Sequence, residues 1–576
     1  MIYLPNMVRG NDAIGLSLMN LVIPPNLKPK LIGRNRVADN KNNVSYDKLT
    51  YSEQTNLQSA LKRGASRREA MQMMMAAGVT VAAAGALVTS AQEAVAATPK
   101  KGGTIKAATH IHGPDDSLDP ATMGTATDYS RGRAHYNGLV QLADDMVPQP
   151  ELAEEFGANA DATEWTFKLR KDVEFHDGSK LTADDVIYTM NRHYGDDSTS
   201  VVKSLVKSVK EWKKVGPHEV KAVLESSYAD LPAVLGEKQF KIIKDGTTDF
   251  QNPTGTGPFK LEEYKPGIRS RHVRNDNYWR EGANLDAIEI FGITDPVARV
   301  NALLAGDVNL AANIAPKAIE EIEATDGVEV SSIPSGSYMG LCMLATKSPG
   351  NNADFVAGMK LLHRRERIVK TILKGHGTVG NDQPINVAYG VDFCDDIAPR
   401  AYDPDQAKHL IGKSGITEAE IQVAEVSSGV TDVCLMWQRE CAKIGFNLKI
   451  TKVPTDGFWG SYWQTSPMNV TAWNMRPTAT IMLDIAYHPD APWSDTWWKD
   501  ERMGKLLTQA KSETDPANRH ALQCQMQAIV RDGSGVIIPA HRNIVDGRAS
   551  NVMGMPRLAL GNLGASEWPE FAWLDS

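Results

Sequence analysis

The stretch TDVCLMWQRECAKIGFNLKI, residues 431–450, contains both kinds of element from which the fold is built. Residues 431–444 have the length and pattern of a helix, and we expect Gly445 to end it because glycine readily adopts the left-handed conformation found after many helices. Residues 446–450 then alternate apolar and polar side chains, as in a strand with one buried face. A helix followed directly by a strand is a unit of layered domains, so we predict an α/β fold.

Strands are predicted on both sides of this unit. Residues 100–108 indicate a short strand entered from a glycine turn, residues 165–170 alternate with a period of two, and residues 536–539 form an apolar run suited to a buried strand. No repeat of fixed period is present, which argues against solenoids and propellers.

Capping residues mark the starts of three helices. Thr182, with Asp185 three positions later, matches a capping box. Asp-Pro pairs at 403–404 and 515–516 each place an N-cap acid before a proline, whose missing N–H is not needed in the first turn. Helices and strands are therefore expected to alternate along the chain.

The length and composition indicate a large globular protein. The chain has 576 residues, several times the ~150 residues of a typical domain, so we expect at least two cores or one large scaffold with insertions. Apolar residues make up 42% of the chain, charged residues 23% and aromatic residues 7%. This profile argues against the fibrous, disordered and multi-span membrane classes.

The charge is unevenly distributed along the chain. Its net value is -8, yet residues 1–97 carry 11 Lys and Arg against 6 Asp and Glu, and the remainder carries 51 against 64. Because the neutralisation of nucleic-acid phosphates requires a basic surface, the acidic body argues against a DNA- or RNA-binding role.

The first hundred residues have the features of an export signal. Residues 1–65 are polar and lack periodicity, so we expect them to be a disordered or wrongly assigned extension. Residues 66–97 combine Arg67 and Arg68, an uncharged stretch rich in Ala and Gly, and the motif Ala94-Val95-Ala96. Together these features resemble a twin-arginine signal peptide.

Two alternatives stay open for this segment. Ala70 stands where a large apolar residue is usual in the twin-arginine pattern, so export by the general secretory route is the first alternative. The uncharged stretch is also long enough for a membrane anchor. We favour cleavage near Ala96, which would release a protein of 480 residues into the periplasm.

The five cysteines predict one disulfide or none. They stand at positions 342, 394, 434, 441 and 524, without a C-x-x-C pair or zinc-finger spacing, so no structural metal and no cofactor are expected. Cys434 and Cys441 lie about 10 Å apart along one predicted helix, which is beyond the reach of a disulfide. These two are therefore not expected to pair with each other.

Common catalytic motifs are missing from the sequence. It has no G-x-S-x-G, no G-x-x-x-x-G-K-[ST], no H-E-x-x-H and no EF-hand loop. We therefore predict that the protein is not an enzyme. A periplasmic hydrolase stays as an alternative, because a catalytic triad or carboxylate pair is recognised by geometry and not by spacing in the sequence.

Seven short motifs occur in an order that resembles a known family. They are DSLDPA (116–121), YNGLV (136–140), PQPELA (148–153), WTFKLR with VEFHDG (165–178), TADDV (182–186), TGTGPF (254–259) and NDNYW (275–279). Together they resemble the family 5 extracellular solute-binding proteins of ABC importers, which bind dipeptides, oligopeptides or nickel chelates. The likeness runs from about Gly102 to Asn551.

The resemblance implies a particular α/β architecture, the two-lobe periplasmic binding protein of type II, in its large variant with an extra subdomain in lobe one. Two hinge-crossing strands would join the lobes near residues 332–344 and 536–541. Lobe one would then comprise 102–333 plus 536–576, and lobe two 334–535.

The resemblance also implies a function. The protein would be a monomer that captures a solute by lobe closure in the periplasm and delivers it to an ABC permease of the inner membrane, without covalent chemistry. Peptide-like solutes are the first expectation, and small organic anions or conjugates are the second. A sensor that reports the solute to a membrane receptor stays as an alternative, because it would use the same binding chemistry.

A loop in lobe two is expected to touch the solute. In peptide-binding members a Trp-rich loop carries an Asp for the peptide's ammonium group, and the matching loop here is residues 472–480. Pro477 stands where that Asp would fall, with Arg476 beside it. A guanidinium suits a carboxylate or phosphate, so Arg476 is predicted to bind an anion. Trp473 and Asn474 of the same loop are further candidates.

Three more residues are candidate solute contacts. Trp459 belongs to a segment, residues 458–498, that is dense in aromatic side chains, as a small-molecule pocket would be. Tyr338 stands where the first crossing strand would reach the cleft, and His110 follows the first predicted strand. His110 and His112 could also be metal ligands, although we expect no metal site, because histidines at strand ends more often form ordinary hydrogen bonds.

Overall fold

The computed structural model leaves most of the amino-terminal segment undescribed. The predictions of a disordered extension, of an uncharged export segment and of cleavage near Ala96 therefore lie outside the described residues, apart from helix α2 (Arg67–Ala76). Among the residues that are described, no helix is both long and apolar enough to cross a membrane. The described residues are 66–76 and 99–575 without 196, 456 and 492, together with Leu57, Ala84 and Val88.

One large sheet has seven strands in the order β12-β19-β11-β1-β10-β9-β8. Strand β1 lies in its middle and pairs in parallel with β10 and β11, whereas the outer pairs are antiparallel. The strands are β1 (Thr104–Thr109), β8 (Phe259–Lys265), β9 (Arg269–Arg274), β10 (Ala287–Gly292), β11 (Leu310–Ala311), β12 (Val328–Ile333) and β19 (Ile544–Ala549).

Helices cover this sheet through apolar side chains. Val300 and Leu303 of α7 and Ile322 of α8 form a buried cluster with Ala108 of β1. The helices and short elements around the sheet are α4 (Ala126–His135), α7 (Pro296–Leu304), η3 (Pro316–Ala318), α8 (Ile319–Glu323), β20 (Val552–Met553), α17 (Asn562–Ala565), α18 (Trp568–Phe571) and β21 (Trp573–Leu574).

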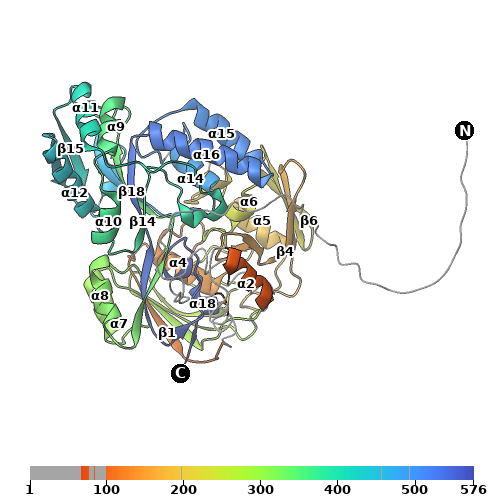
Figure 1. The fold of residues 1–576 in the computed structure, drawn as a ribbon. Coiled ribbons are helices and arrows are strands. Elements are labelled where there is room, and N and C mark those ends of the chain that lie inside the picture. Colours follow the sequence, from red (N-terminus) through yellow and green to blue (C-terminus); the bar gives the residue numbers. More distant parts are fainter. Residues whose placement is uncertain are drawn as a thin grey trace, which may run out of the picture.

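A smaller antiparallel sheet has four strands in the order β4-β5-β7-β6 and lies to one side of the first sheet (Figure 1). Its core includes Phe167 and Trp212, whose rings are 5.7 Å apart. Its elements and their neighbours are β2 (Val140–Leu142), β3 (Pro148–Pro150), β4 (Ala153–Ala158), β5 (Glu164–Leu169), α5 (Ala183–Asn191), η2 (Lys203–Val206), β6 (Val209–Gly216), β7 (Glu219–Leu224) and α6 (Leu231–Leu235).

The third sheet has six strands in the order β14-β18-β13-β17-β15-β16. Helices of the same chain region surround it (Figure 1). Its elements are β13 (Tyr338–Met343), α9 (Ala353–Lys360), α10 (Arg365–Thr371), β14 (Gly377–Val379), η4 (Val387–Asp392), α11 (Pro404–Ser414), β15 (Glu418–Val423), α12 (Val430–Lys443), β16 (Asn447–Lys452), α13 (Phe458–Ser461), β17 (Met468–Trp473), α14 (Ala479–Tyr487), α15 (Glu501–Ser512), α16 (Pro516–Gly533) and β18 (Val536–Arg542).

The chain passes between the large sheets twice. It leaves β12 of the seven-stranded sheet for β13 of the six-stranded sheet, and it returns from β18 to β19. The two crossings are joined by a hydrogen bond of 2.7 Å from the backbone N–H of Arg542 to the carbonyl of Ser337. We call the seven- and four-stranded sheets with their helices the first lobe, and the six-stranded sheet with its helices the second lobe.

The second crossing comes later than the sequence-based division places it. That division assigns residues 536–541 to lobe one, but β18 pairs with β13 on one side and with β14 on the other, so it lies in the second lobe. The chain returns at Asn543. An apolar run such as Val536–Pro539 can be buried in the sheet of either lobe, and only the strand pairing decides between them.

The elements predicted from local patterns are confirmed. The opening stretch forms α12 and β16, with Gly445 at a φ of 81° between them, and β16 pairs in parallel with β15. Trp437 of α12 and Leu448 of β16 are buried in the same core. Strands β1, β5 and β18 match the other predictions.

The predicted helix starts are also confirmed. Both the backbone N–H and the hydroxyl of Thr182 donate to Asp185, at 2.7 and 2.9 Å. The side chains of Asp403 and Asp515 accept backbone hydrogen bonds as the N-caps of α11 and α16. These caps satisfy N–H groups that the helices leave without partners.

One disulfide is present among the described cysteines. It joins Cys394 to Cys524, whose Cα atoms are 5.2 Å apart, and links the loop after η4 to α16. Cys434 and Cys441 are unpaired, as their spacing along one helix predicts. The bridge therefore holds together two segments of the second lobe that are far apart in the sequence.

Candidate functional site

The candidate site lies where the two lobes meet, next to the crossings. The first crossing contacts the first lobe there, because the Ser335 hydroxyl donates to the carbonyl of Ala559 at 2.7 Å. Beside this contact, within the first lobe, the amino group of Lys238 donates to the carbonyl of Leu560 at 3.3 Å. The backbone N–H of Gly336 contacts the sulfur of Met475 at 3.2 Å. Segments of both lobes are thus held side by side at this place.

Arg476 comes from the second lobe, after the end of β17. Its backbone N–H donates to the hydroxyl of Tyr389 at 3.2 Å, and its guanidinium lies 5.9 Å from the centre of the Trp493 ring. The Nε atom is buried and has no hydrogen-bond partner among the described residues. The guanidinium is therefore positioned from the backbone and by the indole ring, and its Nε donor is unused among the described residues.

Trp473 and Tyr338 lie beside this loop. They are opposite each other on the neighbouring strands β17 and β13, and both are buried. The Trp473 ring is 6.1 Å from that of Trp493, and the Tyr338 hydroxyl is 3.1 Å from that of Tyr487. Trp473, Trp493, Tyr338 and Tyr487 thus form a group of aromatic side chains, which we call the aromatic wall, and Arg476 contacts it through Trp493.

The indole of Trp473 is held by a buried carboxylate. Asp495 accepts hydrogen bonds from Trp473 at 2.8 Å, from Trp463 at 2.7 Å and from the hydroxyl of Thr471 at 2.8 Å. Burial raises the pKa of Asp495 to about 6, against the effect of these three donors. Asp495 therefore fixes the orientation of the Trp463 and Trp473 rings through hydrogen bonds.

His110 lies after β1 in the first lobe, in a different electrostatic environment. Its pKa is lowered to about 4, first by burial and then by the charges of Arg299 and Arg542, so the ring is neutral at pH 7. Burial also lowers the pKa of Arg542 to about 10. The Nδ1 atom of His110 and the Nε atom of Arg542 are buried and have no partner among the described residues.

No metal centre is formed around these groups. Within the described part of the chain, no three His, Cys, Asp or Glu side chains are grouped as metal ligands. The neighbour of His110 in the sequence motif, His112, lies 2.9 Å from the carbonyl of Gly267 through its Nδ1 atom. This is the ordinary hydrogen-bonding role expected for a histidine at a strand end.

Three of the predicted contacts, His110, Trp459 and Asn474, form no hydrogen bond or ring contact with Arg476, Trp473 or Tyr338 within the described part of the chain. Trp459 lies on α13 with 46% of its surface exposed, and it packs against Phe458 and Trp463. Asn474 is exposed at the end of β17. Their roles in solute binding stay predictions.

Sequence reasoning missed Tyr389, which contacts Arg476, and two residues of the first lobe that lie within electrostatic reach of it or of Tyr389. Tyr389 follows the strand β14, and Tyr129 and Glu237 come from the first lobe. Glu237 is only 6% exposed, and its Oε1 atom has no hydrogen-bond partner among the described residues. No motif or periodicity marks these positions, because they meet only through the packing of the two lobes.

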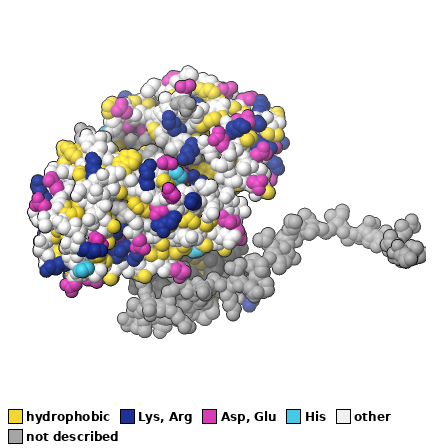
Figure 2. Space-filling model, turned by 90° about the horizontal axis from the view of Figure 1, so that it is seen from above, with side chains coloured by type: hydrophobic (Ala, Val, Ile, Leu, Met, Phe, Trp, Pro, Cys, Tyr) yellow, Lys and Arg dark blue, Asp and Glu magenta, His cyan; other side chains and the backbone are white. Residues whose placement is uncertain are grey.

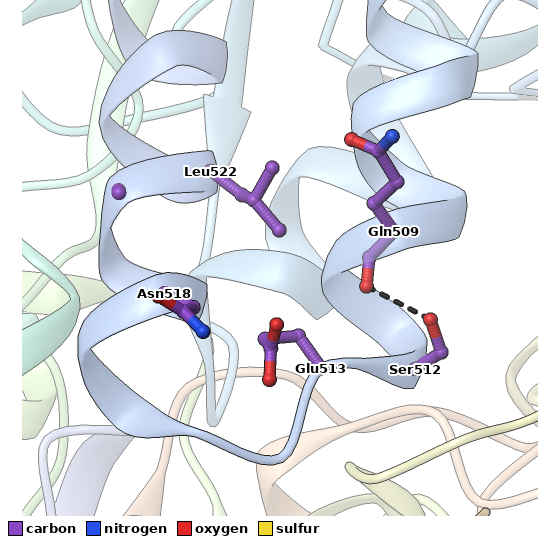
Figure 3. Close-up of a pocket in the computed structure, with 6 residues that line it drawn as sticks. Gln509, Ser512, Glu513, Asn518 and Leu522 are labelled. Atoms are coloured by element: carbon purple, nitrogen blue, oxygen red, sulfur yellow. Dashed lines mark hydrogen bonds between the residues drawn. The ribbon is translucent and has the colours of Figure 1, made fainter.

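A separate hollow of about 470 Å³ lies on the surface between α15 and α16 (Figure 3). Gln509, Ser512, Glu513 and Asn518 are among the residues that line it, and all but Glu513 are exposed. These side chains form the ordinary polar surface of two packed helices. The hollow offers no buried charge that could select a ligand, and it is therefore not the candidate site.

Comparison with known proteins finds a matching family and a curated relative. The family described as "Bacterial extracellular solute-binding proteins, family 5 Middle" matches residues 147–491, which is more than half of the chain. The dipeptide-binding protein of Escherichia coli K12 is 24% identical over 491 residues, which cover 77% of this chain and 90% of the relative.

Solved structures with the same fold include two with different ligands. DppA of Helicobacter pylori, in complex with the peptide STSA, is 21% identical, with a TM-score of 0.70 over 83% of this chain and 99% of that one. AgaA of A. tumefaciens R10, in complex with agropinic acid, is 21% identical, with a TM-score of 0.71 over 82% of this chain and 99% of that one. The two-lobe fold is thereby established.

Proposed function

Because the chain belongs to the bacterial extracellular solute-binding proteins of family 5, we propose that it captures a small solute between its two lobes and delivers it to an ABC permease in the inner membrane. The observation that carries this proposal is the double crossing of the chain between the large sheets. Two short crossings allow the lobes to rotate about a hinge, as in other proteins that close around a ligand.

Contacts between the lobes support a mechanism of closure. Asp230 of the first lobe forms an ion pair with Arg519 of the second. The backbone N–H of Ala229 also donates to the carbonyl of Lys511 at 2.9 Å. A solute that touches both lobes would add to these contacts and shift the population toward the closed form.

The solute class follows from Arg476 and from the relatives. Peptide-like solutes lead, because the E. coli relative is a dipeptide-binding protein and one solved relative holds a peptide. Small organic anions come second, since Pro477 replaces the expected acid and Arg476 offers an unused guanidinium. We propose that Trp473, Tyr338 and His110 contribute to the same site, with Asn474 and Trp459 at its margin.

Export to the periplasm agrees with the structure of the second lobe. The disulfide between Cys394 and Cys524 is of the kind that persists in oxidising compartments. We propose that residues 66–97 direct this export through a twin-arginine-like signal cleaved near Ala96, and that the mature protein acts as a monomer. No bond of the solute would be made or broken.

The test is to identify the solute and to follow closure. Native mass spectrometry of the protein purified from its own periplasm should reveal a bound molecule that is recovered intact. Small-angle X-ray scattering should then show a smaller radius of gyration when this molecule is added. Scattering that stays the same with every solute, or turnover of the bound molecule, would contradict the proposal.

A further inference from the structure

Two opposite charges in the region where the lobes meet each have a buried atom without a hydrogen-bond partner among the described residues, Oε1 of Glu237 and Nε of Arg476. Glu237 stands two residues after α6 in the first lobe, and Arg476 stands three residues after β17 in the second. Buried polar groups almost always have hydrogen-bond partners, and buried charges are almost always paired. A carboxylate and a guanidinium that break this rule at the same place point to a missing partner.

Glu237 is held firmly by its backbone while its side chain is unused. Its N–H donates to the carbonyl of Val234 at 2.9 Å, and its carbonyl accepts from Phe240 at 3.2 Å. The residue is 6% exposed, and its Oε1 atom is buried without a partner in the described part of the chain. The backbone therefore fixes a carboxylate that forms no ion pair with the described residues of the first lobe.

The nearest lysine in the sequence has other contacts. The amino group of Lys238 donates to the carbonyl of Leu560 and lies 5.4 Å from the centre of the Tyr129 ring. Burial lowers the pKa of Lys238, and the charge of Arg476 also lowers it, whereas the charge of Glu237 opposes both. Lys238 thus lies within electrostatic reach of both unpaired groups without forming an ion pair with Glu237.

Two phenols lie within reach of both unpaired charges. The pKa of Tyr129 is raised to about 12, first by burial and then by Glu237, while Arg476 opposes the rise. The pKa of Tyr389 is also raised, mainly by burial, and Arg476 and Glu237 again act on it in opposite directions. Tyr129 accepts a hydrogen bond of 3.0 Å from Gln239, and Tyr389 accepts one from Arg476. Both phenols therefore lie close enough to Glu237 and Arg476 to feel the two charges.

We propose that Glu237 and Arg476 form the two ends of a site for a zwitterion of the amino-acid type, in which Glu237 binds the ammonium group and Arg476 binds the carboxylate. This inference rests on the proposed function and deepens it. The ammonium group would be bound by the first lobe and the carboxylate by the second. A zwitterion would then bridge both lobes through charged hydrogen bonds and favour closure.

The charge requirement can be tested with chemically blocked ligands. The probe is an enzymatic casein hydrolysate, which contains free amino acids and short peptides, added to the full-length protein while tryptophan fluorescence and the melting temperature are followed. Acetylation of the hydrolysate removes its ammonium groups, and methyl esterification removes its carboxylates. Each treatment should weaken the apparent affinity of the wild-type protein by roughly tenfold or more, since each removes one charged hydrogen-bonding group.

Two variants assign each end of the solute to one residue. Glu237→Gln should bind the untreated hydrolysate at least roughly tenfold more weakly and should no longer distinguish it from the acetylated one. Arg476→Gln should lose the distinction between untreated and esterified hydrolysate. Glu237→Asp and Arg476→Lys keep the charge and should keep most of the distinction, which separates a charge effect from a folding defect.

Surface substitutions on each lobe serve as matched controls. Glu155 is exposed on the first lobe and paired with Lys168, and Arg502 is exposed on the second lobe and paired with Asp500. Glu155→Gln and Arg502→Gln should behave like the wild type. The inference is overturned if the wild type does not respond to the untreated hydrolysate, or if it binds the blocked forms equally well. Closure around a different solute would still leave the proposed function intact.

Discussion

Buried polar side chains organise the proposed site at the scale of single residues. Asp495 lies behind the aromatic wall and accepts hydrogen bonds from Trp463, Thr471 and Trp473. Its carboxylate satisfies three donors that would otherwise be buried without partners, which is why an acid is tolerated in this apolar environment. Arg476 lies over the Trp493 ring, and its Nε atom has no hydrogen-bond partner among the described residues.

Asp495 should make the stability of the protein depend on pH. Burial raises its pKa to about 6 from an ordinary value of about 4, so between these values the folded protein binds a proton that the unfolded chain has released. Asp495 should therefore contribute a fall of about 3 kcal/mol in the unfolding free energy as the pH rises from about 4 to about 6, while buried histidines with lowered pKa values, such as His110 and His272, act in the opposite direction. Urea titrations across this range measure it.

Asp495→Asn should remove this contribution, because an amide does not titrate. The unfolding free energy of the variant relative to that of the wild type should therefore rise by about 3 kcal/mol as the pH rises from about 4 to about 6. Other titrating groups, such as Asp546, whose pKa burial also raises to about 6, contribute equally to both proteins. Asp490→Asn, a change of a largely exposed acid, provides the control and should keep the wild-type slope. Equal slopes in the Asp495 variant and the wild type would contradict the prediction.

Arg476→Ala should weaken solute binding by about 1.5–3 kcal/mol, the range for a buried hydrogen bond to a charged group. Calorimetry with the solute recovered from the protein measures this difference. Unchanged affinity would remove Arg476 from the site.

At the scale of elements, the second lobe depends on a covalent link between distant segments. Tyr389 and Asp392 lie in η4, and the disulfide joins Cys394, just after η4, to Cys524 of α16. Gln527 of α16 adds hydrogen bonds to the backbone of the same segment, from its amide to the carbonyl of Asp392 at 2.8 Å and to its carbonyl from the N–H of Cys394 at 3.2 Å. The segment that borders Arg476 is thus fastened to a helix of 18 residues.

Removal of this link should destabilise the second lobe. A cross-link between residues 130 positions apart removes much of the entropy of the unfolded chain, so Cys394→Ser should lower the unfolding free energy by several kcal/mol, up to about 5. Melting curves with and without a reducing agent measure the loss. The reducing agent should have little further effect on the variant, and Cys434→Ser, a change at an unpaired cysteine, should keep its sensitivity to reduction.

At the scale of the whole molecule, contacts between the lobes determine how readily they separate. Leu231 of α6 and Ile481 of α14 belong to one cluster of buried apolar side chains, and the ion pair between Asp230 and Arg519 lies next to it. The surface is otherwise a mixture of acidic and basic side chains on the face shown in Figure 2. The ion pair between Asp230 and Arg519 is therefore a local contact that would favour the closed form that we propose.

Asp230→Asn should shift the lobes toward an open arrangement. The substitution removes the charge that pairs with Arg519 across the lobes, so the radius of gyration of the ligand-free protein should increase in X-ray scattering. Asp184→Asn removes an exposed ion pair with Lys214 inside the first lobe and should leave the radius unchanged. An identical radius in the Asp230 variant and the wild type would show that this pair does not control closure.

The sequence by itself determined the local elements and the family. The capping box at Thr182, the Asp-Pro helix starts and the unit of α12 and β16 were predictable because their signals act between residues a few positions apart. The order of the seven motifs indicated the two-lobe fold. The departure of the loop around Arg476 from the family pattern is also visible in the chain, and its role in binding stays a prediction.

Only the tertiary structure decided which groups share the site. The pairing of β18 with β13 and β14 moved the second crossing to Asn543, and the pairing of Cys394 with Cys524 could not be selected from the five cysteines. Glu237 gave no signal at all, because an unpaired carboxylate is defined by what surrounds it. Burial and partnership arise when distant segments pack together, and a pattern of neighbours along the chain does not contain them.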